Sequence, residues 1–356
     1  MEFGIFVLMQ QRGYHQAPAD VLRNALEQTV LADQVGIDTA WFAEHHFSNY
    51  ALCPSPLMMV AHCAALTKRI KLGSAVCVLP LYHPARLMAE AGFADTVSGG
   101  RLQFGIGTGY QDFEFERFGV KLSDAPEIFN EFLDVIQLGL TKRVFDYEGK
   151  HVRFPPTAIS MPSVQKPIPP LWLATGHERT QRRAFREGHN LFVTALLNGT
   201  DKLRALRDNL DRVAAQENGG AGRTKVALLR CAFASDDENE IRQYLECARY
   251  QRRISESLRD RRAQSADGYM IEEVPSPTDP SLDSIRANLP IGSVDYVIER
   301  LVEELRILRP DHVAIQTQLG DFDHATTLRQ LELWGTRIIP AVRAALGTDV
   351  KLATAA

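Results

Sequence analysis

The chain has 356 residues, of which 45% are hydrophobic and 24% charged, and its formal net charge at pH 7 is -4. These values are typical of a globular protein with a sizeable core, and they argue against a nucleic-acid-binding surface and against a polybasic membrane anchor. Five scattered cysteines without Cys-x-x-Cys spacing argue against a zinc site and a disulfide framework. No signal peptide or membrane-spanning apolar stretch stands out, so we expect a cytoplasmic protein that acts on a small molecule.

Strands and helices are predicted to alternate from the start of the chain. Residues 3–8 form an apolar run without a polar face, which predicts a strand covered on both sides. Residues 18–35 place apolar side chains at helical spacing before Gly36, and residues 39–43 predict a second strand. The same patterns predict strands at 70–79, 102–106, 170–174, 190–194, 226–234 and 311–316, and helices at 54–67, 84–97, 178–187, 201–217, 238–262 and 325–346. This alternation favours a single (β/α)8 TIM barrel over residues 1–356, with a doubly wound open sheet as the alternative.

Two stretches interrupt the alternation, at about 144–160 and 264–290. Residues 144–154 alternate around a Glu-Gly turn, which predicts a β-hairpin inserted before the fifth strand. The second stretch carries four prolines and few apolar residues, so we expect it to form no packed element. It is either a linker or a mobile cover over the barrel mouth, and the helix and strand that follow it favour the cover.

Polar side chains follow the second strand at the point where it leaves the core. They are Glu44, His45 and His46. The carboxyl ends of barrel strands meet at one rim, which is where such folds bind their ligands. A solvated loop would give the same local pattern, but other strand ends carry polar groups as well. We therefore take these three residues as the candidate functional centre.

Glycine-rich turns follow the fourth and fifth strands. In the run Gly105-Ile106-Gly107-Thr108-Gly109-Tyr110 the glycines let backbone N–H groups approach a phosphate or a flat ring, although such turns also occur for steric reasons alone. Thr175-Gly176 leads into a predicted helix, whose first N–H groups and dipole favour a phosphate. Arg179 and Thr180 in the first turn add a charge and a hydroxyl group. The alternative is that Thr175 only caps the helix.

A set of motifs is spread along most of the chain. The motifs are MEFGIF at 1–6, GIDTAWFAEHHF at 36–47, KLGSAV at 71–76, Leu79-Pro80-x-x-His83-Pro84-x-Arg86, SGGRLQFGIG at 98–107 and IGSVD at 291–295. Together they resemble the bacterial luciferase-like flavin monooxygenases, over about residues 1–345. The Glu-His-His-Phe motif is specific to the monooxygenases of this superfamily, whereas the glycine run also occurs in deazaflavin-dependent relatives.

The resemblance implies a TIM barrel that binds reduced FMN supplied by a separate flavin reductase. Such an enzyme holds O2 as a flavin C4a-hydroperoxide and transfers one oxygen atom to a small, mostly apolar organic substrate. His45 would lie beside the reacting flavin carbon, with Glu44 as a second catalytic residue and Phe47 and His83 as substrate contacts. The cofactor-binding residues would be Ala75 and Val76 at a non-proline cis peptide, Gly107, Thr108 and Tyr110, and a phosphate site of Thr175, Gly176 and Thr180, together with Arg179. We also expect a homodimer and no bound metal.

The chain departs from luciferase itself at two places. Gly107 and Thr108 stand where luciferase has a reactive cysteine and an arginine, and the phosphate turn lacks luciferase's acidic residue. Light emission and an aldehyde substrate are therefore not implied. Three other functions stay open, namely a deazaflavin-dependent dehydrogenase on the same barrel, a non-catalytic flavin-binding subunit, and a metal hydrolase that uses Glu44, His45 and His46. The hydrolase is disfavoured because consecutive strand residues point to opposite faces.

Overall fold

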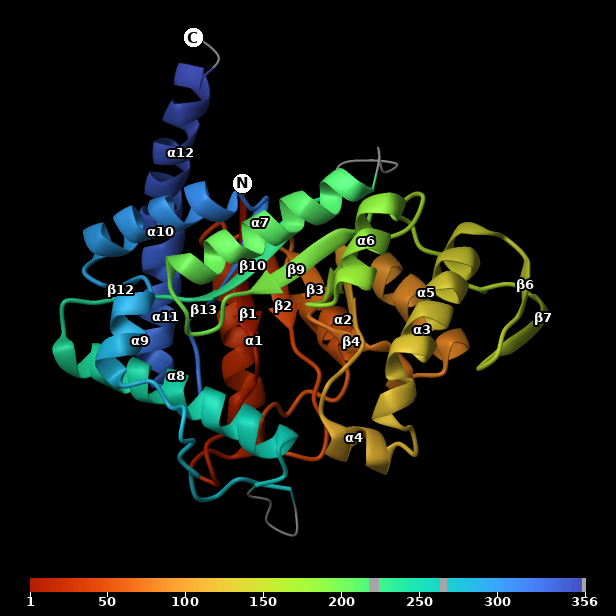
Figure 1. Ribbon diagram of the computed structural model, residues 1–356, viewed down its shortest axis with the longest axis horizontal. Helices are drawn as coiled ribbons and strands as arrows, with labels where there is room; N and C mark the ends of the chain where they lie inside the picture. The colour runs from red at the N-terminus through yellow and green to blue at the C-terminus, as the bar shows by residue number, and fades with distance from the viewer. Residues whose placement is uncertain (218–223, 263–267, 354–356) are drawn as a thin grey trace.

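A closed barrel of parallel strands forms the centre of the computed structural model, which describes residues 1–217, 224–262 and 268–353 (Figure 1). Each barrel strand pairs in parallel with its neighbours, and pairing of β3 with β5 closes the ring. The eight barrel strands are β1 (Glu2–Val7), β2 (Thr39–Phe42), β3 (Lys71–Ser74), β5 (Leu102–Gly107), β8 (Leu171–Ala174), β9 (Asn190–Thr194), β10 (Val226–Cys231) and β13 (His312–Gln316). This topology confirms the predicted (β/α)8 barrel.

Helices surround the barrel, and a few of them lie at its carboxyl-terminal end rather than against the outer faces of the strands (Figure 1). They are α1 (Pro18–Gln34), α2 (Pro56–Leu66), α3 (Pro84–Val97), α4 (Asp112–Arg117), α5 (Ala125–Thr141), α6 (Glu178–Glu187), α7 (Thr200–Gln216), α8 (Glu238–Arg259), α9 (Leu282–Asn288), α10 (Val294–Leu308), α11 (His324–Leu333) and α12 (Ile339–Ala353), with short turns η1 (Leu79–Leu81), η2 (Leu122–Asp124) and η3 (Trp334–Ile338). Long helices pack through an apolar stripe, as α5 does with Ile128, Phe132, Val135 and Ile136. None of the described helices is both long and apolar enough to cross a bilayer.

Aromatic side chains fill the barrel interior. The indole of Trp41 packs edge-on against Trp172 and Phe192, with ring centroids 5.5 and 5.1 Å away, and its Nε1 donates to His312 Nε2 at 2.8 Å. Burial lowers the pKa of His312, so the neutral imidazole can accept this bond. A Cβ at Gly73 would lie 2.4 Å from the Trp41 ring, so only glycine fits there. The filled interior confines ligand binding to the carboxyl-terminal rim.

Two predicted strands are each interrupted. Residues 70–79 form β3 and β4 (Cys77–Val78) on either side of a non-proline cis peptide between Ala75 and Val76. This observation confirms the cis bond that the resemblance implied. Residues 226–234 form β10 and β11 (Phe233–Ala234), and β11 pairs outside the barrel with β12 (Ile291–Gly292).

The predicted hairpin before the fifth barrel strand is confirmed. It consists of β6 (Phe145–Glu148) and β7 (Arg153–Thr157), which pair antiparallel and project from one side of the barrel (Figure 1). The chain between β5 and this hairpin was not assigned to any element from its sequence. It forms α4 and α5, and α5 completes the strand-helix alternation.

The proline-rich stretch is more regular than its composition predicts. Residues 264–267 lie outside the described part of the chain. Further on, Met270 is buried and its backbone N–H and C=O both bond to the Asn49 side chain, at 3.0 and 3.1 Å. The helix α9 then buries Ile285 completely. The expectation of no packed element is therefore wrong for α9, and the mobile cover that we expected of this stretch stays a prediction.

Candidate active site

Alternate side chains at the end of β2 have separate surroundings. Glu44 and His46 lie together, with 2.9 Å between Glu44 Oε1 and His46 Nε2. The His45 ring instead lies 4.4 Å from the Tyr50 ring and 5.9 Å from the Tyr110 ring, measured between centroids. The side chains of His45 and His46 therefore contact different sets of residues. Within the described ranges no group of three His, Cys, Asp or Glu side chains is arranged to hold a metal ion.

Glu44 belongs to a closed hydrogen-bond network. Its side chain is 0% exposed, and its Oε2 accepts hydrogen bonds from the Tyr82 hydroxyl at 2.7 Å and from the Val78 N–H at 3.3 Å. Burial raises the pKa of Glu44, and the bonds from His46, Tyr82 and Val78 act in the opposite direction. This carboxyl group ties the end of β2 to β4 and η1. The structure does not bring it to the barrel mouth, so the catalytic role expected for Glu44 has no support in this geometry.

A carboxylate that the sequence did not reveal holds His45. Glu114 in α4 places its Oε1 3.0 Å from His45 Nδ1 and 2.8 Å from the backbone nitrogen of His46. Its side chain is only 2% exposed. Because a carboxylate accepts hydrogen bonds, Nδ1 of His45 donates to Glu114, and Nε2 is the ring nitrogen outside this hydrogen bond. The helix α4 has only 6 residues, too few for a readable periodicity, so no pattern pointed to this residue.

Residues expected to bind a flavin ring lie along the same rim. Ala75 and Val76 are half-buried, whereas Ser74 and Cys77 on either side of them are buried. Val76 packs against Gly107, where a Cβ would lie 2.6 Å from Val76 Cγ2. Thr108 follows the end of β5 and is also half-buried. Ala75, Val76 and Thr108 are therefore partly accessible at the neighbouring ends of β3 and β5.

The turn between β8 and α6 has room for a ligand. Thr175 Oγ1 accepts a hydrogen bond from the His177 N–H at 3.0 Å, so Thr175 shapes the turn while His177 occupies the N-cap position. Nothing lies within 4 Å of the position that a Cβ on Gly176 would take. Thr180 is buried, whereas Arg179 is exposed. An open turn at a helix start is suited to a phosphate, as the sequence predicts.

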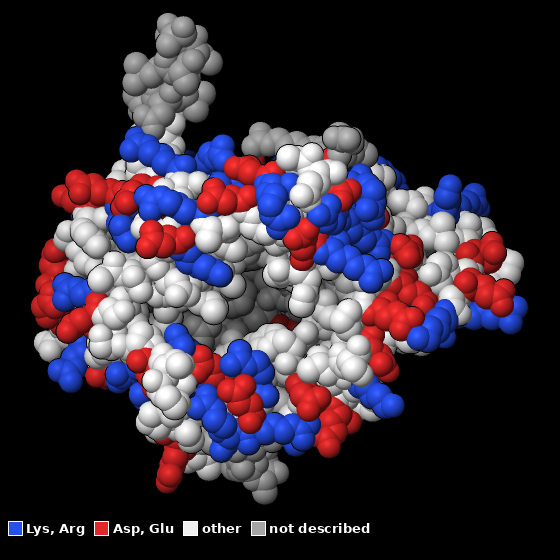
Figure 2. Space-filling model, viewed as in Figure 1, with Lys and Arg blue, Asp and Glu red and all other residues white. Residues whose placement is uncertain are grey.

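A cavity of about 350 Å³ opens between α8 and the carboxyl ends of β9, β10 and β13. We call it the mouth cavity, and Figure 2 shows a hollow near the middle of the face that carries α8. It is lined by Tyr50, which contacts His45, so the cavity begins beside that imidazole. The Tyr110 hydroxyl lies 3.5 Å from the hydroxyls of Tyr50 and Ser255. One face of α8 lines the cavity with Ala248, Gln251, Arg252, Ser255, Glu256 and Arg259, and the strand ends add Thr194, Leu229, Cys231 and Gln316.

Comparison with known proteins shows which family the chain belongs to. A family model described as luciferase-like monooxygenase matches residues 1–312. The chain belongs to this family. It is 58% identical to an uncharacterised protein of Sinorhizobium fredii over 98% of this chain and 99% of the relative. It is 30% identical to the oxygenase component of the flavin-dependent trigonelline monooxygenase of Acinetobacter baylyi, over 67% of each chain.

Solved structures of the same fold include other luciferase-like barrels. One is the oxygenating constituent of 3,6-diketocamphane monooxygenase of Pseudomonas putida, a type II Baeyer–Villiger monooxygenase in complex with FMN. It matches 96% of this chain and 98% of its own with a TM-score of 0.77 at 21% identity. Likeness at this identity shows the fold, and membership of the luciferase-like family supports a flavin-dependent monooxygenase.

The rim of this luciferase-like barrel fits FMN on structural grounds. The open turn at Gly176 precedes α6, whose free first N–H groups suit a phosphate. The half-exposed peptide at Ala75 and Val76 suits one face of a flat ring. A bound flavin would supply the redox chemistry, and Ala75, Val76 and the turn at Gly176 are the residues that would hold it.

Two residues expected to contact substrate do not line the mouth cavity. The Nδ1 of His83 accepts a hydrogen bond from the Ala85 N–H at 3.3 Å and caps α3. Phe47 packs on Phe118, with 5.5 Å between ring centroids. The structure does not bring either side chain to the mouth cavity of this luciferase-like barrel, and their substrate contacts stay predictions.

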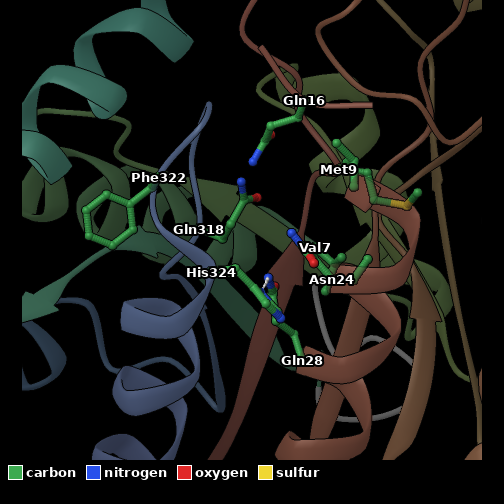
Figure 3. A pocket seen from close by; sticks show the side chains of 10 residues that line it. Val7, Met9, Gln16, Asn24, Gln28, Gln318, Phe322 and His324 are labelled. Atoms are coloured by element: carbon green, nitrogen blue, oxygen red, sulfur yellow. Dashed lines mark hydrogen bonds between the residues drawn. The ribbon is translucent and has the colours of Figure 1, made fainter. Parts of the chain in front are cut away.

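A second hollow in the luciferase-like barrel lies beside β1 and α1. The side chains of Gln16, Gln28, Gln318 and His324 converge on it (Figure 3). Its volume is about 10 Å³, room for about one water molecule. A hollow of this size is too small for an organic ligand.

Proposed function

We propose that the protein is a two-component monooxygenase that uses reduced FMN and O2 to oxygenate a small organic substrate. The observation that carries this proposal is His45, held by the buried Glu114 carboxylate and placed beside the mouth cavity. Oxygen is activated as a flavin C4a-hydroperoxide. One oxygen atom enters the substrate and the other leaves as water, while reduced FMN gives up two electrons and ends oxidised.

The residues around His45 suit this chemistry. An imidazole whose Nδ1 is bonded to Glu114 presents only Nε2 to the reacting groups, so proton transfer is confined to one atom. Tyr50 and Tyr110 flank the ring, and the His45 side chain is only 11% exposed, which limits the access of bulk water. Exclusion of water matters because an activated oxygen that meets water is lost as hydrogen peroxide.

Rapid mixing of the protein with reduced FMN and oxygenated buffer tests the proposal. We expect a long-lived absorbance of an oxygenated flavin, followed by product in the presence of substrate. Immediate oxidation to FMN and hydrogen peroxide with every substrate tried would support a non-catalytic flavin-binding subunit. Hydride transfer to a deazaflavin without use of oxygen would support the dehydrogenase alternative.

We further propose that the protein works as a homodimer with a transient flavin reductase partner. The outer faces of α2 and α3, which pack on each other, expose Met58 by 72%, Phe93 by 51%, Leu66 by 48% and Val97 by 43%. An apolar patch of this kind is suited to a protein interface. The expected cytoplasmic location and single-domain organisation stay predictions.

A further inference from the structure

The wall of the mouth cavity on α8 is rich in cationic groups. Arg252 and Arg259 line it together with a single carboxylate, Glu256. Arg252 Nε lies 2.9 Å from Glu256 Oε1, and Arg252 Nη2 donates to the backbone oxygen and the hydroxyl of Thr278, each at 3.2 Å. Arg259 Nε donates to its exposed neighbour Asp260 at 3.0 Å, and Asp260 is not part of the lining. The lining thus has two guanidinium groups for one carboxylate, which favours an anionic ligand.

An unpaired amide lies at the floor of the same cavity. Gln316 at the end of β13 is only 1% exposed. Its Oε1 accepts from Gln251 Nε2 at 3.4 Å and from the Cys231 thiol at 3.7 Å, and these two donors set the orientation of the amide. Among the described residues its Nε2 has no hydrogen-bond partner. A buried donor without a partner is unfavourable, and an acceptor on a bound ligand would satisfy it.

The remaining lining is apolar and lies closer to the strand ends. Leu196, Leu197 and Leu229 contribute side chains there, and Tyr50 joins this region to His45. A cavity of about 350 Å³ is at the small end of the range for ligand pockets. It therefore suits a compact molecule with an apolar skeleton.

We propose that the mouth cavity binds the substrate and that this substrate is a small organic acid. Its carboxylate binds Arg252 and Arg259, an acceptor atom meets Gln316 Nε2, and its carbon skeleton packs against Leu196 and Leu229 on the path to His45. This inference rests on the proposed monooxygenase function and refines the expected mostly apolar substrate.

The test measures binding of three matched probes to the FMN-loaded, oxidised protein without turnover. Calorimetric titration with benzoate, benzyl alcohol and benzylamine should rank benzoate first, by about 10-fold or more over the alcohol. Arg252→Gln and Arg259→Gln should each weaken benzoate by about 10-fold, whereas Arg252→Lys should keep most of the affinity. The control is Arg242→Gln, since Arg242 lies exposed on α8 outside the lining and pairs with Glu246.

Two results would overturn the inference. One is equal affinity for the three probes, or benzoate binding that neither Arg252→Gln nor Arg259→Gln changes in variants with the thermal stability of the parent. The other is an Arg252→Gln variant that loses affinity for FMN but not for riboflavin, because the guanidinium group would then hold the cofactor phosphate. The oxygen-mixing experiment tests the monooxygenase function independently of the binding experiment. If benzoate binds as expected but no oxygenated flavin forms, the monooxygenase function is refuted and the anion-binding cavity is not.

Discussion

Replacing Glu114 tests whether the buried carboxylate positions His45 for chemistry. In Glu114→Ala, the His45 Nδ1–H and the His46 N–H both lose their acceptor, at 3.0 and 2.8 Å in the parent. Hydrogen bonds to a charged group contribute about 1.5–3 kcal/mol each, so the free energy of unfolding should fall by about 3–6 kcal/mol if no water replaces the carboxylate. An imidazole that can rotate or change tautomer should lower kcat about 10–100-fold, with KM nearly unchanged.

Glu114→Gln separates position from charge. The amide oxygen can accept the same two hydrogen bonds, so stability and kcat should fall less than in Glu114→Ala. Glu116→Ala is the matched control, because Glu116 lies on the exposed side of α4 and pairs with Arg261 at 3.0 Å. The assay is rapid mixing of reduced FMN and oxygen, with product and hydrogen peroxide quantified per folded enzyme. If folded Glu114→Ala forms product at the parental rate, while His45→Ala does not, Glu114 is only a structural residue.

Three further changes probe the phosphate turn, the acid stability and the subunit interface. Thr175→Glu should weaken FMN about 10-fold or more but riboflavin little, because a carboxylate at a helix start repels phosphate; equal weakening in fluorescence titrations would place the phosphate elsewhere. His312 and then Lys71 lower the pKa of Glu2 from 4.5 to about 2, so its ionised form stabilises the fold above pH 4.5 and this contribution is lost as the pH falls toward 2. Glu2→Gln should therefore cost stability at about pH 7 and less at about pH 3 in denaturant unfolding, and a pH-independent loss would contradict the assignment. Met58→Glu should shift the protein toward monomers in sedimentation velocity, and an unchanged sedimentation coefficient would exclude this face as the interface.

The sequence predicts the barrel well because buried strands and amphipathic helices leave periodic patterns. The helix at 84–97 lies where the pattern put it, since it packs on the barrel through buried apolar residues such as Leu87, Met88 and Ala91. Glu114 could not be found this way. It meets His45 from 69 positions further along the chain, and only the fold brings the two together. The prediction for the proline-rich stretch was incomplete for a related reason. Hydrogen bonds such as those between the Asn49 side chain and the Met270 backbone hold this stretch, and such bonds leave no apolar pattern in the sequence.

Glu44 and His45 at the end of β2 are consecutive residues with different surroundings. Glu44 holds β2 to Val78 and Tyr82, which follow the peptide at Ala75 and Val76, so the proposed flavin support and the turn with His45 belong to one network. His45 points the other way, toward Tyr50 and the mouth cavity. The alternation of a strand thus lets a fully buried carboxyl group fix the geometry while its neighbour His45 faces the mouth cavity, where we propose that it acts. The Glu44-His45-His46 motif therefore locates the candidate site in the sequence. The burial of each side chain in the fold then decides which of them can contact a substrate.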